Sequence, residues 1–176
     1  MPEQRTRLTD EEVIARCPWA TTGRTHHRTP NIITSLELDP AEMEKRNIHL
    51  QKKYAEIEET KYVSKNFTAK MTEYLIVAFG SCARIAQKAM EIAREEGIKV
   101  GLLRPITLWP FPSKAIAARA AQVKGILTVE LNAGQMVEDV RLAVECKVPV
   151  EHFGRLGGIV PDPDEVITAL KEKLIK

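Results

Sequence analysis

The sequence has 176 residues, a length that suits one compact domain with an arm or at most two small domains. Its 26 basic and 24 acidic residues give a net charge of only +2, and no block of five or six basic residues occurs. Nucleic-acid binding is therefore not indicated. The apolar runs are too short to cross a bilayer and no signal-peptide core follows Met1, so we expect no membrane association and a cytoplasmic location.

The arrangement of cysteines and histidines does not favour a metal site. Cys17, Cys82 and Cys146 are widely spaced and include no Cys-x-x-Cys pair, which is typical of ordinary reduced thiols. None of the four histidines has a second histidine or a glutamate at ligand spacing. We expect no metal ligand in this chain.

Residues 1–70 are predicted to form an N-terminal helical arm with a linker. Thr9 and Glu12 have the spacing of a capping box, and residues 18–30 have the composition of a loop. A second helix is expected over about 40–59, beginning at Asp39-Pro40. Its apolar residues at roughly helical spacing are Met43, Leu50, Tyr54 and Ile57. Residues 62–67 are predicted to add an antiparallel edge strand.

The arm contains too few apolar residues to form a substantial core of its own. We therefore expect it to pack on the α/β domain, on another subunit or on a domain outside this sequence. The prediction that follows is an oligomeric protein, either a homo-oligomer or a hetero-oligomer.

Residues 72–176 alternate between apolar runs of β type and segments of helical period. The predicted strands are 74–79, 98–103, 126–131 and 148–153. Ser81, Ser113 and Asp162 are placed to begin the helices, and Gly97 and Gly125 to end two of them. Four strand–helix units in succession predict a three-layer α/β domain with an open, mostly parallel sheet.

Each predicted strand is followed by residues that could serve a ligand or a partner, because open α/β sheets bind at the carboxyl ends of their strands. Ser81 is either part of an anion-binding turn or simply a helix cap. Trp109 and Phe111, in a proline-rich loop, are either interface anchors or a roof over the core. A carboxylate at Glu130 could contact a cofactor or cap a neighbouring subunit, and residues 154–158 form either a closing loop or a tight turn. The candidate interface residues are Gly80, Ser81, Arg84, Arg104, Trp109, Phe111, Glu130, Asn132, Gln135, Met136 and Arg155.

Four motifs in this order resemble one known family. They are the strand and turn at 74–81, Gly-Leu-Leu-Arg-Pro-Ile-Thr-Leu-Trp-Pro-Phe-Pro at 101–112, Val-Glu-Leu-Asn-Ala-Gly-Gln-Met at 129–136, and Gly-Arg-Leu-Gly-Gly at 154–158. The resemblance is to the alpha subunit of 2-oxoacid:ferredoxin oxidoreductases of the 2-ketoisovalerate and 2-oxoglutarate types. It covers roughly residues 15–175 and implies the transketolase C-terminal fold for the second half.

The resemblance implies oxidative decarboxylation of a 2-oxoacid to an acyl-CoA with reduction of ferredoxin. Thiamine diphosphate, Mg and iron–sulfur clusters would serve the assembled complex, whose beta and other subunits would be the partners. The sequence departs from a complete alpha subunit because the family's first domain does not precede Met1. It also lacks the Gly-Asp-Gly signature and cluster-binding cysteines. We therefore expect no catalytic residue here, no cofactor bound by this chain alone, and a non-catalytic assembly role.

Two other functions remain open from the sequence. One is the C-terminal domain of another thiamine-diphosphate enzyme, of the transketolase or dehydrogenase beta type. The other is a stand-alone α/β binding module, because a fold by itself does not determine a function. The sequence equally leaves open a split subunit, a truncated product or a fragment, and it does not identify the 2-oxoacid.

Overall fold

The computed structural model of the chain describes residues 7–21, 29, 31–67 and 71–175. It divides into two compact units, Met1–His49 and Leu50–Lys176. The boundary between the units lies before residue 72, where the alternation of apolar runs and helical segments begins. The reason is that the residues just before 72 include a strand that pairs with the sheet of the second unit.

Two helices form in the arm where the sequence predicts them. α1 (Asp10–Arg16) has the predicted capping box, in which Thr9 N donates to Glu12 Oε2 over 2.8 Å and Glu12 N to Thr9 Oγ1. α2 (Pro40–Thr60) begins where Asp39 Oδ1 accepts a hydrogen bond from Ala41 N. Neither helix has a buried residue. Residues 22–28 and 30 of the predicted loop, including His26 and His27, lie outside the described residues.

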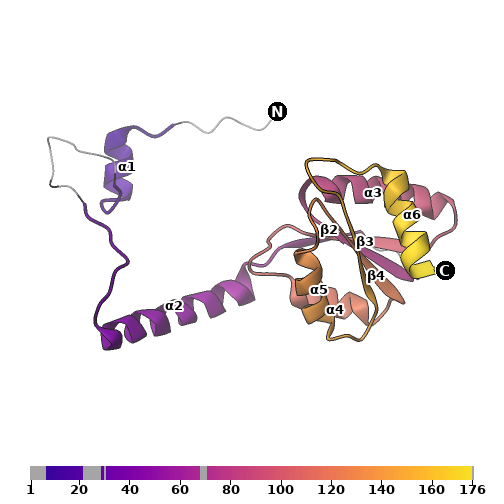
Figure 1. The fold of residues 1–176 in the computed structure, drawn as a ribbon. Helices are drawn as coiled ribbons and strands as arrows, with labels where there is room; N and C mark the ends of the chain where they lie inside the picture. The colour runs from indigo at the N-terminus through magenta and orange to yellow at the C-terminus, as the bar shows by residue number, and fades with distance from the viewer. Residues whose placement is uncertain (1–6, 22–28, 30, 68–70, 176) are drawn as a thin grey trace. The chain divides into compact units, whose positions relative to one another are not determined.

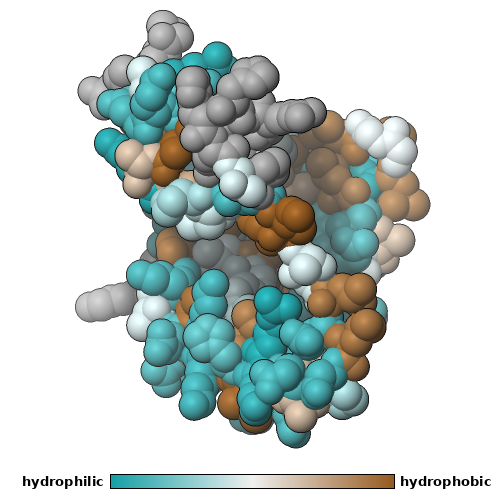
Figure 2. Space-filling view, turned by 90° about the vertical axis from the view of Figure 1, so that its left-hand side faces the viewer, coloured by the Kyte–Doolittle hydropathy of each residue, from teal (hydrophilic) through white to brown (hydrophobic). Residues whose placement is uncertain are grey.

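Large apolar side chains of the first unit are exposed. Those with more than 60% of their surface exposed are Trp19, Ile32, Ile33, Leu36 and Leu38. Figure 2 shows brown apolar residues among teal hydrophilic ones on the face that it draws. Among the described residues, the first buried one along the chain is Leu75. The arm is therefore short of a core of its own, as its composition predicts.

The second unit contains a five-stranded sheet. Its strands are β1 (Ser64–Phe67), β2 (Tyr74–Ala78), β3 (Val100–Pro105), β4 (Gly125–Glu130) and β5 (Val150–Gly154). They lie in the order β1-β3-β2-β4-β5, and only β1 is antiparallel to its neighbour. The mostly parallel α/β fold and the antiparallel edge strand are both confirmed. No helix among the described residues is long and apolar enough to cross a membrane.

Helices cover both faces of this sheet (Figure 1). α3 (Gly80–Glu95) and α6 (Pro163–Leu170), which continues as a π-helical turn η1 (Lys171–Ile175), pack on one face. α4 (Ser113–Ala120) and α5 (Met136–Val144) pack on the other. Successive residues of β2 serve the two cores in turn, with Ile76 facing α3 and α6 and Val77 facing α4 and α5. This alternation follows from the two-residue period of a strand and explains the unbroken apolar run.

Three predicted helix boundaries are wrong. α3 begins at Gly80, so Ser81 lies in its first turn and the N-cap is Phe79, which has no side-chain acceptor. α4 begins at Ser113 itself, after Pro112. Gly125 starts β4 instead of ending α4. By contrast Asp162, which accepts from Glu165 N at 2.8 Å, caps α6 as predicted.

Candidate functional site

The carboxyl edge of the sheet contains a topological switch point between β2 and β4. These strands are neighbours, yet the chain leaves β2 for α3 on one face and leaves β4 for α5 on the other. Connections that diverge in this way open a crevice where α/β proteins bind ligands. The turn after β2 requires glycine, because Gly80 has φ +56°. The loop after β4 comprises residues 131–135.

Glu130, the last residue of β4, lies at this edge and faces the interior of the protein. Its side chain is fully buried, and Oε2 accepts hydrogen bonds from Met136 N (2.8 Å), Gln135 N (3.2 Å) and Asn132 Nδ2 (3.1 Å). Oε1 accepts from Val137 N at 3.0 Å. The carboxylate therefore caps the N-terminus of α5, where a negative charge is favoured. In this chain the oxygen atoms of Glu130 face the chain's own amides, and a contact with a cofactor or a neighbouring subunit stays a prediction.

Neighbouring residues hold this arrangement in place. Nδ1 of the half-buried His152 lies 3.5 Å from Glu130 Oε1 and 3.3 Å from Thr128 Oγ1. A Cβ on Gly154 would lie 2.2 Å from the Asn132 carbonyl oxygen, so β5 must end in glycine for the 131–135 loop to pass over it. Asn132 Oδ1 in turn accepts from Gly134 N at 2.7 Å. The edge is thus fixed by contacts within the chain.

The three cysteines are free thiols that differ in burial. Burial, together with the negative charge of Glu130, raises the pKa of the Cys82 thiol, which keeps it protonated and unreactive near neutral pH. Cys17 is half-buried and Cys146 is exposed. Within the part of the chain that the structure describes, no three His, Cys, Asp or Glu side chains come together as metal ligands. These residues do not fit an iron–sulfur cluster or a bound Mg ion.

The loop after β3 belongs to a different part of the edge, next to β1. Ile106 N donates to Val63 O (2.9 Å) and Val63 N donates to Thr107 Oγ1 (2.9 Å). Trp109 stays 56% exposed and meets Tyr54 of α2 edge to face, with ring centroids 5.5 Å apart. Phe111, on the other hand, is half-buried against the core under α4 and α5. Phe111 therefore roofs the core, whereas Trp109 does not, and the interface role of Trp109 stays a prediction.

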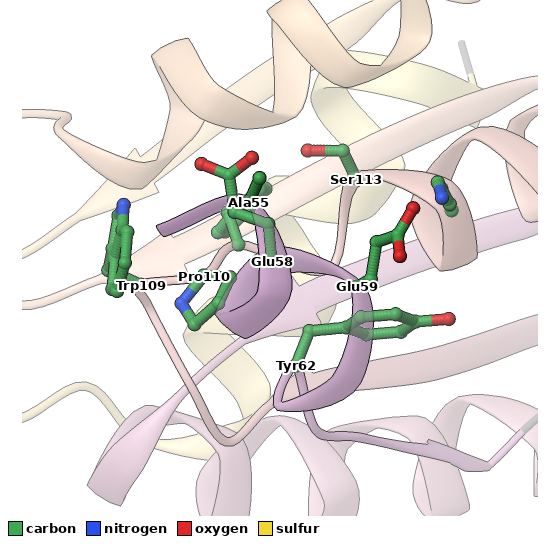
Figure 3. Close-up of a pocket in the computed structure, with 9 residues that line it drawn as sticks. Ala55, Glu58, Glu59, Tyr62, Trp109, Pro110 and Ser113 are labelled. Atoms are coloured by element: carbon green, nitrogen blue, oxygen red, sulfur yellow. The ribbon is translucent and has the colours of Figure 1, made fainter. Parts of the chain in front are cut away.

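A pocket of about 520 Å³ lies beside Trp109. Its walls are the last turns of α2 and the start of α4 with the loop before it, as Figure 3 shows. The residues that line it are Ala55, Glu58, Glu59, Tyr62, Trp109, Pro110, Phe111, Ser113 and Lys114. Its size is in the range of small-molecule and side-chain sites. It combines exposed aromatic rings with two carboxylates.

The predicted site residues fall into separate groups. Glu130, Asn132, Gln135 and Met136 come together around α5, and Arg155 N donates to Glu130 O at 3.2 Å. Met136 is buried, whereas Gly80, Ser81, Arg84 and Gln135 are exposed. Arg155 Nη1 lies 3.3 Å from Glu165 Oε1. Arg104 lies in β3, and Trp109 and Phe111 follow this strand, which β2 separates from β4.

Sequence reasoning missed four residues of these sites. His152 stands alone in the sequence and meets Glu130 only because β4 and β5 are neighbours. Glu58 and Glu59 read as the polar end of an arm helix, and Tyr62 as the first residue of the predicted edge strand. The one available signal was the predicted edge strand at 62–67, which brings the preceding residues to the sheet.

Comparison with known proteins gives the family. Residues 72–166 match the model of pyruvate:ferredoxin oxidoreductase core domain II. The chain belongs to this family. The match to core domain II covers the sheet from β2 to β5 and confirms the resemblance drawn from the four motifs.

Relatives with curated descriptions come from the same group of enzymes. Ketoisovalerate oxidoreductase subunit VorB of Methanothermobacter thermautotrophicus is 41% identical over 165 residues, which cover 92% of this chain and 46% of that subunit. 2-Oxoglutarate synthase subunit KorA of Archaeoglobus fulgidus is 30% identical over 141 residues, covering 80% and 40% respectively. This chain thus spans about half the length of these relatives.

Two solved structures share the fold. 2-Oxoglutarate:ferredoxin oxidoreductase from Magnetococcus marinus superposes with a TM-score of 0.66 at 23% identity, over 77% of this chain and 24% of that one. A split-gene transketolase, described as an inactive β4 tetramer, gives a TM-score of 0.54 at 18% identity, over 63% and 41%. The predicted transketolase-like architecture of core domain II is therefore confirmed.

Proposed function

We propose that this chain is a non-catalytic assembly part of a 2-oxoacid:ferredoxin oxidoreductase and is inactive alone. The observation that carries the proposal is the family match of residues 72–166 combined with coverage of only 46% of a subunit that is 41% identical. Such a chain supplies one domain of a larger enzyme. Neither of the alternative functions, another thiamine enzyme or a stand-alone module, is favoured by these matches.

The chemistry of the described residues favours a non-catalytic role for this chain. At the switch point the carboxylate of Glu130 is occupied by four hydrogen bonds from its own chain. The thiol of Cys82 is buried, with a raised pKa. Thiamine diphosphate, Mg and iron–sulfur clusters, which the family's reaction requires, would therefore sit on partner subunits. Those partners would include a beta subunit with the thiamine signature and a ferredoxin-type subunit, in the cytoplasm.

For the substrate we propose a branched-chain 2-oxoacid such as 2-ketoisovalerate. The ketoisovalerate relative is 41% identical over 92% of this chain, whereas the 2-oxoglutarate synthase subunits are 30–32% identical over 54–80% of it. Substrate contacts themselves would lie largely on the rest of the enzyme.

Purification of a tagged chain from its native cells tests the proposal. We expect the complex to contain thiamine diphosphate, measured as thiochrome fluorescence, and to reduce methyl viologen when CoA and 2-ketoisovalerate are both supplied. Turnover with 2-oxoglutarate should be slower. The recombinant chain alone should bind no thiamine diphosphate and show no turnover. A tagged chain recovered without a thiamine-binding partner, or a chain active by itself, would overturn the proposal.

A further inference from the structure

The pocket beside Trp109 has a surface that the core of the domain does not use. Trp109 is 56% exposed, and Tyr54, whose ring plane lies at 83° to that of Trp109, is itself 36% exposed. Tyr62 lines the same pocket with 36% of its surface exposed. Rings held in place yet open to solvent are typical anchors of protein interfaces, since little conformational entropy is lost when a partner binds them.

The charge in this pocket is negative. Glu58 and Glu59 reach into it from the last turns of α2, as Figure 3 shows. In the described part of the chain, neither carboxylate takes part in an ion pair or a hydrogen bond, unlike Glu42 of the same helix, which pairs with Lys45. Lys114 is the single basic residue of the lining, so two carboxylates stand against one ammonium group.

The end of α2 adds to this negative charge. Its last turn contains no basic residue, and the C-terminal end of a helix carries a partial negative charge from its unpaired carbonyl groups. Lys61 N already donates to Ile57 O, and Thr60 Oγ1 to Glu56 O, which satisfies two of these carbonyls. A cation is the ligand that the remaining groups favour.

The kind of cation follows from the lining. A metal ion is not favoured, since the described residues offer no group of three metal ligands. A purely apolar partner would bury two unpaired carboxylates at a large cost in desolvation. A guanidinium group meets both needs, because it stacks on an indole ring and donates paired hydrogen bonds to a carboxylate.

We propose that this pocket, between the end of α2 and residues 109–114, binds an arginine side chain of a partner subunit, with Trp109 as the stacking surface and Glu58 and Glu59 as the hydrogen-bond acceptors. The identity of the partner as a subunit of the oxidoreductase rests on the proposed function. The preference for arginine rests on the lining alone.

The full chain can be tested directly, because it contains only two tryptophans. In a Trp19→Phe variant, the fluorescence of Trp109 alone reports on the pocket. The probe is the peptide acetyl-Gly-Arg-Gly-amide, and its control is the same peptide with citrulline, which keeps the shape but removes the charge. We expect a saturable change with the arginine peptide that weakens with added salt, and binding at least about fivefold weaker for citrulline.

The matched variants are Glu58→Gln/Glu59→Gln and Glu91→Gln/Glu95→Gln. Both pairs remove two negative charges, but Glu91 and Glu95 lie on the exposed side of α3, away from the pocket. We expect the first pair to weaken arginine-peptide binding by about tenfold and the second to leave it unchanged. Circular dichroism checks that both variants fold.

The outcomes separate this inference from the proposed function. No saturable response, an equal response to citrulline, or equal binding by the two double variants would overturn the arginine pocket. If the wild-type chain still copurifies with a thiamine-binding partner in that case, the proposed function stands. If the peptide binds as expected and no such partner copurifies, the pocket stands and the oxidoreductase assignment fails.

Discussion

The two units of this chain handle their apolar residues in opposite ways. From Leu75 onward, apolar side chains fill two cores on the two faces of one sheet. In the first unit, Trp19, Ile32 and Leu38 are mostly exposed, and none of the described residues there is buried. Two cores stabilise a domain without outside help. The arm, in contrast, has the composition of a segment that is completed by contacts elsewhere, which keeps oligomerisation as a prediction.

The largest expected effect comes from removing a core side chain. Leu127 is fully buried, so Leu127→Ala should lower the free energy of unfolding by about 2–5 kcal/mol. Ile33→Ala, at a site 63% exposed, should change it by no more than about 0.5 kcal/mol. Urea denaturation followed by circular dichroism measures both. A cost above about 1 kcal/mol for Ile33→Ala in the isolated chain would contradict the contrast between the units.

The two units also differ in the burial of a glutamate that accepts backbone hydrogen bonds at a helix N-terminus. Glu130 is buried and accepts from three backbone amides, whereas the exposed Glu12 accepts only from Thr9 N. We expect Glu130→Ala to cost about 3 kcal/mol because buried amides lose their acceptor. Glu12→Ala should cost about 0.5–1 kcal/mol.

Thermal and urea unfolding of these two variants supply the measurement, with Glu130→Gln as a control that retains one oxygen acceptor. A stable Glu130→Ala protein that instead loses activity in the assembled enzyme would return this residue to a functional role.

A smaller effect is expected for the aromatic residues after β3. Phe111 packs on a core, so Phe111→Ala should reduce stability by about 2 kcal/mol. Trp109→Ala removes mainly the edge contact with Tyr54 and should cost less than about 1 kcal/mol, yet weaken assembly with partner subunits. Denaturation and copurification of each variant separate the two effects. Equal stability losses would place Trp109 in the core as well.

The smallest effect concerns an exposed charge cluster at the amino ends of the strands. Hydrogen bonds from Lys124 and Lys99 lower the pKa of the Glu73 carboxyl. Because the folded pKa is depressed, the stability that Glu73 contributes is fully present above its ordinary pKa near 4.5 and is lost as the pH falls through the lowered value.

Glu73→Gln should therefore lower the melting temperature slightly at neutral pH and in low salt, with the difference from wild type shrinking in acid. The same difference should shrink at high ionic strength, because both lysine side chains are at least half exposed. A difference that grows as the pH falls below 4.5 would contradict this sign.

The sequence by itself determined the alternation of strands and helices, the edge strand before residue 68 and the capping boxes at Thr9 and Asp162. These features depend on residues close together in the chain, so the periodicity and spacing of those residues are enough to predict them. Only the tertiary structure decided that Glu130 points inward and that Glu58 and Trp109, which are 51 residues apart, line the same pocket. Burial and the order of strands in a sheet are non-local properties, and for that reason no local pattern records them.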